Sequence, residues 1–585
     1  NATGISAYIT TEQEGVSFSQ RNLAYNNIAT GSYAFSTDHA VMRTNMSVNT
    51  LSIPCKLHLS SNQEATNLYP YSIEIPFTVN LSANMPNWPL VLNGQTVSAP
   101  KVADLDGTGN RFITTYNGQL HVVNTQKQYN EGFPMAIGDN TLCGIAIGHL
   151  TGPTNQQQIV VGTSSGTVKV INHLGQVVAE KELGSSVRTA PVIADLNNDG
   201  QNEIIVTTLN SRIWVLNLQG NNLPEWANYP IVLTGQISTH LAVGDVTGDN
   251  IKNIVVNTSG PQAALNVLNP MTRENLPGFP VAGTSNVGPT LARISGTTGL
   301  QIVVPGLSAT NCPIIIYNSD GSVLRQTTIP SKINSDIAIV DLFNDGNQKF
   351  VFIDNSSKLY VKNTDFSDVA GFPKNIGATL ESPPVFANLT NENQKHIIFG
   401  DSNGRLHIVR PNGQYIPGYP LKISNYAIKT SPWVGRFHNY NGVVILVDPE
   451  AVYAIDTKRF IQNRFWNSFR ANNGNTASYN DPTTPDIEII DPVYVNNLSQ
   501  NYPNPFNPTT NIEFTISKNE NVKLSIFNIK GQLVKTIVNE PFKAGQHNVT
   551  WNGLDSNNQT VSSGLYFYKI DTESFTAIKR MIMLK

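Results

Sequence analysis

A short pattern repeats between about residue 85 and residue 479, at intervals of roughly 44–50 residues, and this period constrains the fold more than any other feature. The clearest copy begins with Ala190-Pro191-Val192-Ile193-Ala194-Asp195 and continues through a polar loop. Three further apolar runs follow, near 204–206, 213–216 and 229–233. Each run is short, β-branched or aromatic, and bounded by Gly, Asn or Asp, which predicts four strands per unit.

Repeated four-stranded units predict an all-β fold, a β-propeller, in which each unit forms one blade. Eight unit starts predict eight blades. Seven is the alternative, if the degenerate second unit or the truncated last unit forms no full blade. The starts fall near Ser98, Leu142, Thr189, Thr239, Gly288, Asp336, Ser382 and Thr430.

An aromatic-proline pair after glycine marks the fourth strand. Proline is tolerated there because an outermost strand leaves one side of its ladder unpaired. Such a pair also precedes the first unit, at Trp88-Pro89, whereas the last unit ends without one. We therefore expect Trp88–Leu92 to pair with the last unit near Val452–Ile455 and to close the ring. The marker occurs at Gly132-Phe133-Pro134, Gly278-Phe279-Pro280, Gly371-Phe372-Pro373 and Gly418-Tyr419-Pro420.

These units resemble the FG-GAP/VCBS repeats of integrin-like bacterial propellers, over roughly two thirds of the chain. One loop carries side-chain oxygens at positions 1, 3, 5 and 9, a glycine at position 6, and a backbone carbonyl available at position 7. A hard cation that takes six to eight oxygens, Ca²⁺ above all, is served by this spacing. The loop also resembles the calcium loop of FG-GAP repeats, so we expect structural Ca²⁺ here; an Asx-rich turn without metal is the alternative. The predicted ligands are Asp195, Asn197, Asp199, Gln201 and Glu203.

Other units keep only part of this pattern. The fourth unit predicts a weaker site, and the first predicts the weakest, because Phe112 occupies its ninth position. In the sixth unit Phe343 and Lys349 replace two ligands, so we expect no metal beside Asp341 and Asp345. The weaker set is Asp245, Thr247, Asp249 and Asn253, and the weakest is Asp104 and Asp106.

No catalytic arrangement is visible, and we expect a protein that is not an enzyme. Gly162–Gly166 matches the G-x-S-x-G elbow, which needs a strand running into a helix, but the flanking apolar runs predict a hairpin turn. The ten histidines are scattered without metal-binding spacing. Propellers can gather catalytic residues around their central channel, as in some polysaccharide lyases, and periodicity does not exclude this alternative.

Composition narrows the classes of partner. With 38 basic and 41 acidic residues, the formal charge of −3 gives no argument for nucleic acid or an anionic membrane surface. No apolar run is long enough to span a membrane. Cys55, Cys143 and Cys312 lie far apart and predict isolated buried thiols rather than a disulfide framework. Because the chain starts at Asn1 without a signal peptide, we expect a mature form cut from a longer precursor.

Residues 1–83 alternate apolar and polar side chains in several runs, including 5–9, 16–18 and 73–79, with a turn at 28–32. This pattern predicts a β-sandwich and resembles the immunoglobulin-like module of gingipain-like and subtilisin-like surface proteases. Such a sandwich has about seven strands in about 100 residues, so we expect one or two strands to be missing at its start.

The last 85 or so residues carry the most specific motif. A Pro/Asp/Thr-rich linker, residues 480–499, precedes Asn501-Tyr502-Pro503-Asn504-Pro505-Phe506-Asn507-Pro508 and several alternating runs with Gly at the turns. Together, residues 500–585 closely resemble the type A sorting domain of type IX secretion substrates, which shares its fold with FlgD-like immunoglobulin modules. The resemblance implies that the final strand, 577–585, is read by the type IX machinery.

The predicted organisation is a sandwich at 1–83, a propeller at 84–479, a linker and a sorting domain. The resemblances imply a secreted protein on the outer surface of a Gram-negative bacterium. The leading hypothesis is a binding or adhesion scaffold for an unknown glycan, peptide or protein, with no membrane span. Two alternatives stay open: a self-associating subunit of a fibre or surface layer, and the non-catalytic part of a secreted peptidase.

Overall fold

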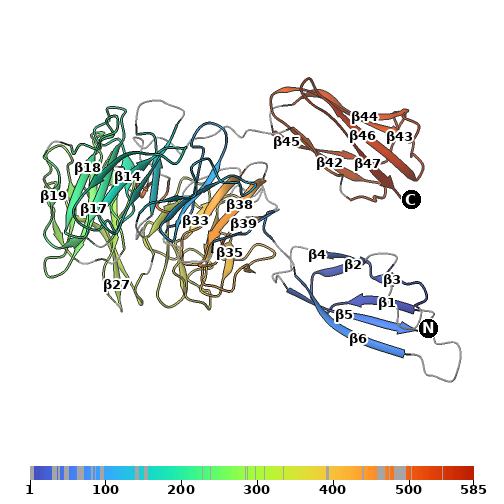
Figure 1. The fold of residues 1–585 in the computed structure, drawn as a ribbon, viewed down its shortest axis with the longest axis horizontal. Helices are drawn as coiled ribbons and strands as arrows, with labels where there is room; N and C mark the ends of the chain where they lie inside the picture. The colour runs from blue at the N-terminus through green and yellow to red at the C-terminus, as the bar shows by residue number, and fades with distance from the viewer. Residues whose placement is uncertain are drawn as a thin grey trace. The chain divides into compact units, whose positions relative to one another are not determined.

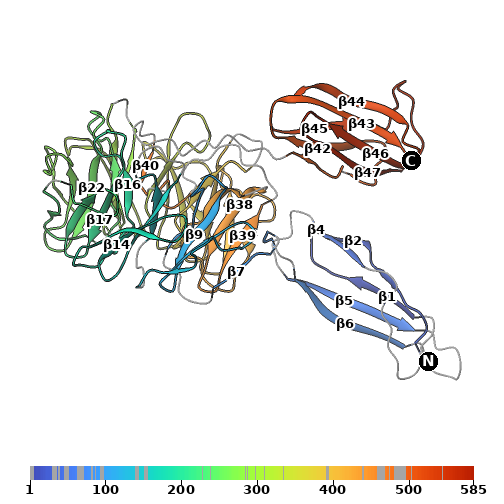
Figure 2. The same ribbon diagram turned by 45° about the horizontal axis from the view of Figure 1, so that its top comes forward.

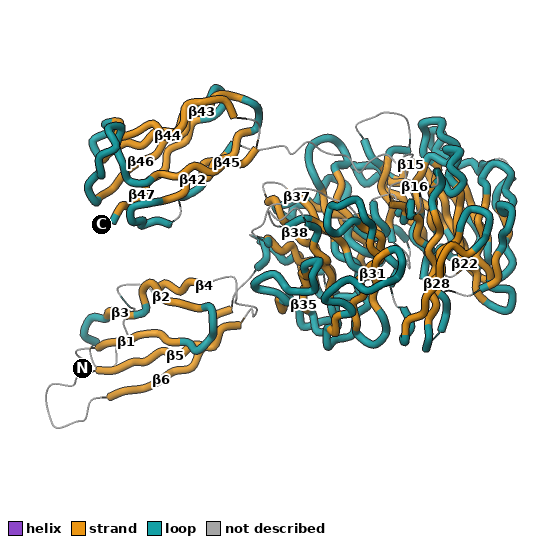
Figure 3. Tube along the Cα trace, turned by 180° about the vertical axis from the view of Figure 1, so that it is seen from behind, coloured by secondary structure: helices purple, strands orange, loops and turns teal. Residues whose placement is uncertain are grey.

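The computed structural model is all β, and its described residues form strands and no helix (Figure 3). The chain divides into two compact units, Asn1–Pro485 and Asp486–Lys585. No stretch of the described residues could cross a bilayer as an apolar helix. The structure describes residues 5–28, 36, 40–44, 52–61, 71–80, 83–85, 87–92, 98–138, 144–150, 156–226, 228–237, 239–283, 285, 287–294, 296, 298–308, 310–333, 335–389, 394–437, 440–457, 468–472, 475–479, 496–501, 503–542 and 545–584.

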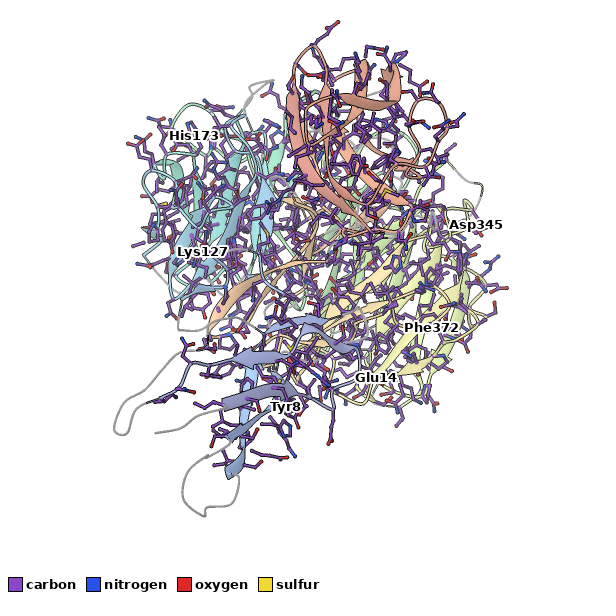
Figure 4. The ribbon with its side chains drawn as sticks, turned by 90° about the vertical axis from the view of Figure 1, so that its right-hand side faces the viewer. Tyr8, Glu14, Lys127, His173, Asp345 and Phe372 are labelled. Carbon is purple, nitrogen blue, oxygen red and sulfur yellow. The ribbon has the colours of Figure 1, made fainter. Side chains whose placement is uncertain are left out.

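The N-terminal segment forms two antiparallel sheets, ordered β3-β1-β5-β6 and β2-β4 (Figure 1). The predicted alternating runs are confirmed, since they lie in β1, β2 and β6. Of the predicted turn at 28–32, all but Ile28 lies outside the described residues. Tyr8, labelled in Figure 4, stacks on His58 at 4.4 Å between ring centroids. The strands are β1 (Ile5–Thr10), β2 (Val16–Gln20), β3 (Asn22–Ala24), β4 (Val41–Thr44), β5 (Ser52–Ser61) and β6 (Tyr71–Asn80).

Sheets of at least four strands then follow one another as a propeller, and among the described residues they match the eight predicted unit starts in order. Leu142 itself lies outside those residues, but its unit forms a full sheet. The number of blades stays a prediction. The first four sheets are β8 (Lys101–Ala103), β9 (Arg111–Tyr116), β10 (Gln119–Val123), β11 (Met135–Ala136); β12 (Ile145–Gly148), β13 (Gln158–Gly162), β14 (Thr167–Ile171), β15 (Val177–Glu182); β16 (Val192–Ala194), β17 (Glu203–Thr208), β18 (Arg212–Leu216), β19 (Ile231–Val232); and β20 (Gln236–Ile237), β21 (Ala242–Gly244), β22 (Asn253–Ser259), β23 (Ala264–Leu268), β24 (Val281–Ala282).

The remaining sheets repeat this order, and two of them take in a strand from a distant part of the chain. They are β25 (Thr290–Ala292), β26 (Gln301–Pro305), β27 (Cys312–Tyr317), β28 (Val323–Ile329) with β40 (Ser478–Tyr479); β29 (Ala338–Val340), β30 (Lys349–Ile353), β31 (Lys358–Asn363), β32 (Lys374–Asn375); β33 (Val385–Ala387), β34 (His396–Gly400), β35 (Arg405–Val409), β36 (Leu421–Lys422); and β37 (Trp433–Phe437), β38 (Tyr440–Val447), β39 (Ala451–Asp456) with β7 (Leu90–Val91).

The predicted closing strand is confirmed. Strand β7 pairs antiparallel with β39, with Leu90 opposite Val452 and Val91 opposite Ala451. The N–H of Met85 extends this contact by donating to the carbonyl of Ala454 at 2.7 Å. The last sheet is therefore completed from the start of the ring, which protects the seam from fraying.

The aromatic-proline pairs precede the outermost strands, as predicted. Phe372, labelled in Figure 4, is buried and stands just before β32. The preceding Gly371 has a φ of +92°, and a Cβ there would lie 2.2 Å from the carbonyl oxygen of Asn412 in the next sheet. Glycine is required at this position because adjacent sheets bring their backbones into contact.

The C-terminal unit is the predicted small antiparallel sandwich, with sheets β41-β42-β45 and β44-β43-β46-β47. Its core surrounds Trp551, and Tyr568 fixes the entering chain by donating to the carbonyl of Ser499 at 2.7 Å. Since β41 lies inside the predicted linker, the sandwich begins earlier than residue 500. Its strands are β41 (Asn497–Leu498), β42 (Thr510–Ile516), β43 (Glu520–Asn528), β44 (Leu533–Phe542), β45 (Gly545–Trp551), β46 (Gly564–Asp571) and β47 (Thr576–Met583).

Trp88→Ala should lower the free energy of unfolding of the ring by about 3–5 kcal/mol, the usual effect of truncating a buried aromatic side chain. Trp88 is buried, donates from Nε1 to the carbonyl of Thr125 at 3.0 Å and packs edge-on against Phe112 and Phe437. Denaturant unfolding followed by circular dichroism measures the change. Val91→Ala is the control, because Val91 in the same segment is 54% exposed. Equal effects of the two substitutions would contradict a stabilising role for the closing segment.

Candidate functional site

The best predicted metal loop connects β16 to β17 and is held by hydrogen bonds of its own. The Asp195 carboxylate accepts from the N–H groups of Asp199 and Gly200, at 3.2 and 2.8 Å. Asn197 donates from Nδ2 to Asp199 at 2.8 Å, and Asp199 also accepts from the N–H of Gln201 at 2.8 Å. The structure thus brings Asp195, Asn197 and Asp199 together on the exposed side of the loop.

Glu203 also makes a structural contact that the other predicted ligands of this loop do not make. Its side chain is fully buried; Oε2 accepts from the N–H of Leu196 at 2.8 Å, and Oε1 accepts from Asn217 at 3.3 Å. Burial raises the pKa of Glu203 to about 7, and the carboxylates of Asp199 and Asp195 act in the same direction. Glu203 therefore anchors the second residue of the loop to the base of the sheet.

The same contact recurs in loops whose acceptor residue is not a carboxylate, a role that the sequence did not reveal. In each loop the side chain near the start of the second strand accepts the N–H of the second loop residue. The acceptors are amides or a histidine ring, so this contact requires neither charge nor metal. The pairs are Gln158 with Leu150, Asn253 with Val246, Gln301 with Ile294, and His396 with Leu389.

The weaker loops share this local geometry. Asp245 accepts from the N–H groups of Gly248, Asp249 and Asn250, while Thr247 donates to Asp245 at 3.4 Å. In the first unit Asp104 accepts from three loop N–H groups, and Asp106 accepts from Thr108. Figure 4 labels Asp345, which accepts from the N–H of Asn347 in the sixth loop. Within the part of the chain that the structure describes, no three His, Cys, Asp or Glu side chains are grouped to hold a metal.

Polar side chains join several loops to the loop of the preceding sheet. Lys252, only 2% exposed, donates to the carbonyl of Asp195 at 3.1 Å. Lys395 donates to the carbonyl of Asp341 at 2.5 Å, and Asn202 donates to the carbonyl of His149 at 2.7 Å. The loops therefore form a continuous polar layer that couples adjacent sheets.

The catalytic motif considered in the sequence is a turn. Gly162–Gly166 connects β13 to β14, which pair antiparallel, as predicted. The described cysteines also follow expectation, since Cys55 and Cys312 are buried and unpaired; Cys143 lies outside the described residues.

Asp401, His407 and Tyr415 form a buried hydrogen-bonded chain. His407 bonds through Nε2 to Asp401 at 3.0 Å and through Nδ1 to Tyr415 at 2.9 Å. Burial lowers the pKa of His407, although Asp401 opposes this. An equivalent bond joins His121 to Tyr129 at 2.9 Å in the first sheet. The recurrence and the burial assign these groups to the framework of the repeat.

The chain itself fills the centre of the ring, which the sequence did not predict. After the last sheet, residues 468–479 (the strap) return to the first strands of the propeller; 468–472 and 475–479 are described. Strand β40, at the end of the strap, pairs parallel with β25, with Ser478 opposite Leu291 (Figure 2). The carbonyls of Thr476 and Ala477 accept the N–H groups of Val243 and Leu291, each at 3.0 Å.

Three polar side chains connect the strap to other sheets. Lys101 of β8 donates to the carbonyls of Phe469 and Asn472 at 2.9 and 2.7 Å, and to Oδ1 of Asn475 at 2.7 Å. Burial, together with the charge of Arg470, lowers the pKa of Lys101 well below its ordinary value. A signal was present in the sequence: Lys101 stands where the clearest unit has the apolar Val192.

The other two polar side chains belong to the strap. Asn475 donates to the carbonyls of Ile145 and Pro191, at 2.8 and 3.0 Å. Arg470 pairs with Asp336 and donates to the carbonyl of Leu241 at 2.6 Å. One short segment thus reaches six sheets, so their first strands converge on a common channel that the strap occupies.

Comparisons with known proteins agree with parts of this architecture. The model of the FlgD Ig-like domain matches residues 503–574, and that of the FG-GAP-like repeat matches residues 195–256. The chain is therefore a β-propeller protein with one segment similar to an FG-GAP-like repeat and another similar to an FlgD Ig-like domain. No curated protein matches it.

Several solved structures are similar at low identity. BamB from Moraxella catarrhalis is 14% identical, with a TM-score of 0.42, over 62% of this chain and 97% of that chain. The Dos1 propeller is 12% identical, with a TM-score of 0.41, over 64% and 97%. The V. cholerae biofilm matrix protein Bap1 is 12% identical, with a TM-score of 0.44, over 67% and 94%.

Glu203→Ala should lower the free energy of unfolding by about 1–3 kcal/mol more than Glu203→Gln, because alanine leaves the buried N–H of Leu196 without an acceptor. Glutamine keeps the acceptor, as Gln301 does for Ile294 at 2.7 Å. Denaturant unfolding with a chelator present isolates this hydrogen bond from any metal effect. Equal losses in the two variants would show that the acceptor contributes nothing.

Proposed function

We propose that this protein is a secreted or cell-surface scaffold that binds a glycan, peptide or protein without transforming it. The observation that carries the proposal is the occupied channel. Propeller enzymes bring side chains from several blades together at the channel, but here Lys101, Asp336 and the surrounding backbone groups are engaged by the strap. Binding is thereby directed to the loops and outer edges of a ring whose seam is closed.

The FG-GAP-like repeat and the FlgD Ig-like domain support this proposal, since both are modules rather than catalytic families. Fold alone does not determine function, so the assignment depends on how the site is built. The sheets carry extensive backbone bonding and shared cores; one core joins Val192 and Ile205 of the third sheet to Val243 and Ile254 of the fourth. A rigid ring of this kind can present a surface of fixed shape to a ligand.

Ligands captured by the purified protein from glycan and peptide arrays should be recovered chemically unchanged. Mass spectrometry of each ligand before and after prolonged incubation makes this test. We expect saturable binding and an unaltered ligand mass. The loop carboxylates bond to the loop and the channel side chains bond to the strap, so these groups are not available to react with a bound molecule. Product formation that increases with protein concentration would contradict the proposal.

The proposal includes structural Ca²⁺ in the β16–β17 loop. Asp195, Asn197 and Asp199 supply the hard oxygen donors that this ion prefers, and the carbonyl of Gln201 and the carboxylate of Glu203 complete the proposed set. The ion would neutralise the two exposed carboxylates and rigidify the turn. The fourth loop, with Asp245, Thr247, Asp249 and Asn253, is proposed to bind more weakly, and the first loop, with Asp104 and Asp106, more weakly still.

Asp199→Ala should lower the melting temperature more in calcium than in chelator, because a ligand bound only by the folded state stabilises that state. Asp345→Ala is a closely matched control. Each aspartate accepts the N–H two residues later at 2.8 Å, but the sixth loop has Phe343 and Lys349 at ligand positions. Its effect should be the same in both conditions. Identical behaviour of the two variants would show that the β16–β17 loop is only a turn.

Export by the type IX machinery is also part of the proposal, supported by the sequence resemblance of residues 500–585. Deleting these residues should leave a folded propeller in the periplasm of a host that has this machinery, because they form a separate core. The matched experiment fuses residues 496–585 to a periplasmic reporter, which should then reach the surface. A reporter that stays in the periplasm would contradict the export role.

A second candidate, a fibre or surface-layer subunit, is favoured by strand β47. It lies at the edge of its sheet and exposes Ile578 and Ile582, at 59% and 42%. Phe506 covers the end of this edge by bonding to Ile582 and Leu584, so only the part of β47 before Ile582 is proposed to pair with another chain. Particle images of native material distinguish the candidates, since a subunit should appear in linked rows and a scaffold as single particles.

A further inference from the structure

We infer that the central channel is a peptide-binding site and that the strap, residues 468–479, is its resident ligand. The strap is held by contacts with the ring rather than by the continuity of the chain. This inference concerns the ring alone and does not depend on the proposed scaffold function.

The backbone of the strap shows that the channel imposes its conformation. Arg470, Ala471, Asn475 and Ala477 have φ values of +55°, +75°, +61° and +52°. Residues other than glycine adopt this left-handed region at a cost of about 1–2 kcal/mol each. A free segment would avoid four such residues within eight positions, so surrounding contacts must compensate for them.

The channel supplies those contacts in a form that recognises particular side chains. Asp336 accepts from the guanidinium of Arg470, while the carbonyls of Leu241 and Pro289 receive its other end at 2.6 and 3.3 Å. A planar group with several fixed donors satisfies such an arrangement, whereas a lysine ammonium at this place would not. Arg470 is thus a specificity determinant of the proposed ligand.

Glycine at position 288 gives the arginine room to enter. A Cβ at Gly288 would lie 2.6 Å from Nη1 of Arg470 and 2.8 Å from the carbonyl oxygen of His240. The N–H of Gly288 donates to Asp336 at 2.9 Å and orients the carboxylate that receives the arginine. Gly288 therefore leaves space for the arginine, and Asp336 supplies the opposite charge.

The side-chain amide of Asn475 and the backbone of the strap determine the remaining specificity of the channel. Asn475 joins three sheets, through Lys101, Ile145 and Pro191. The ammonium of Lys101 also donates to two backbone carbonyl oxygens of the strap, so neutral oxygens of the strap serve as its acceptors. The channel thus fits a segment with an arginine followed, five residues later, by an asparagine.

The experiment cuts the full chain on both sides of the strap. Specific protease sites are introduced within 458–467 and 481–495, and the cleaved protein is analysed by native mass spectrometry. We expect the strap peptide to stay bound to the ring through gel filtration. Loss of the peptide from the cleaved wild-type protein would overturn the inference.

Arg470→Ala in the cleaved protein should increase release of the peptide at least tenfold. Lys101→Met should do the same, whereas Lys252→Met, which removes a buried lysine that joins two sheets elsewhere, should retain the peptide. Equal retention in all three variants would overturn the inference, because the named contacts would then not hold the strap.

A competition arm uses the unaltered ring, so it does not depend on the folding of variants. A synthetic peptide of residues 468–479 should exchange with the resident peptide of the cleaved wild-type protein, detected by a mass label. The same peptide with Arg470→Ala should exchange at least tenfold less. Exchange to equal extents would show that the channel does not recognise the arginine.

Discussion

The backbone groups that face the ring axis are the constraint on which this architecture depends. Within its own repeat unit, the first strand has a neighbouring strand on one side only, and a buried N–H or C=O without a partner is costly. The strap supplies partners through the carbonyls of Thr476 and Ala477 and through the donors of Arg470 and Asn475. The ring and the strap therefore form one hydrogen-bonded core, although they are distant in sequence.

Two distant segments thus complete the propeller in different ways. Strand β7 extends the last sheet at its outer side, whereas β40 extends the fifth sheet at its first strand. The outer addition continues a ladder of apolar residues, since β39 is buried from Ala451 to Ile455. The inner addition requires buried charge, and Lys101 and Arg470 are balanced by carbonyl oxygens and by Asp336. Burying a charge is tolerated when its donors find acceptors, as both Nη groups of Arg470 and the ammonium of Lys101 do, although Nε of Arg470 has no hydrogen-bond partner among the described residues.

The sequence predicted what short-range patterns determine. Turn residues and β-branched runs marked the strands of the third sheet, and the unmatched pair Trp88-Pro89 predicted the closing strand because proline restricts where a strand can lie. The strap was missed because its contacts join residues far apart in the sequence, from 134 positions for Asp336 and Arg470 to 374 for Lys101 and Asn475, and its own sequence has no alternation. An isolated lysine within an apolar first strand was the one local sign of it.

The predicted metal loop shows why the fold is easier to predict from the sequence than the site. The spacing of its oxygens predicts a set of metal ligands. The residue at the ninth position also has a structural role, because it accepts a hydrogen bond from the loop backbone, and any acceptor side chain can do this. Glu203, Asn253, Gln301 and His396 all receive the N–H of the second loop residue, and only the first of these is a carboxylate. Because several residue types can accept this hydrogen bond at the ninth position, a loop can lose its acidic residues while its sheet stays intact. The carboxylates of Asp195 and Asp199 also accept loop N–H groups, as Asp341 and Asp345 do in the sixth loop, so the turn explains these residues even without a metal.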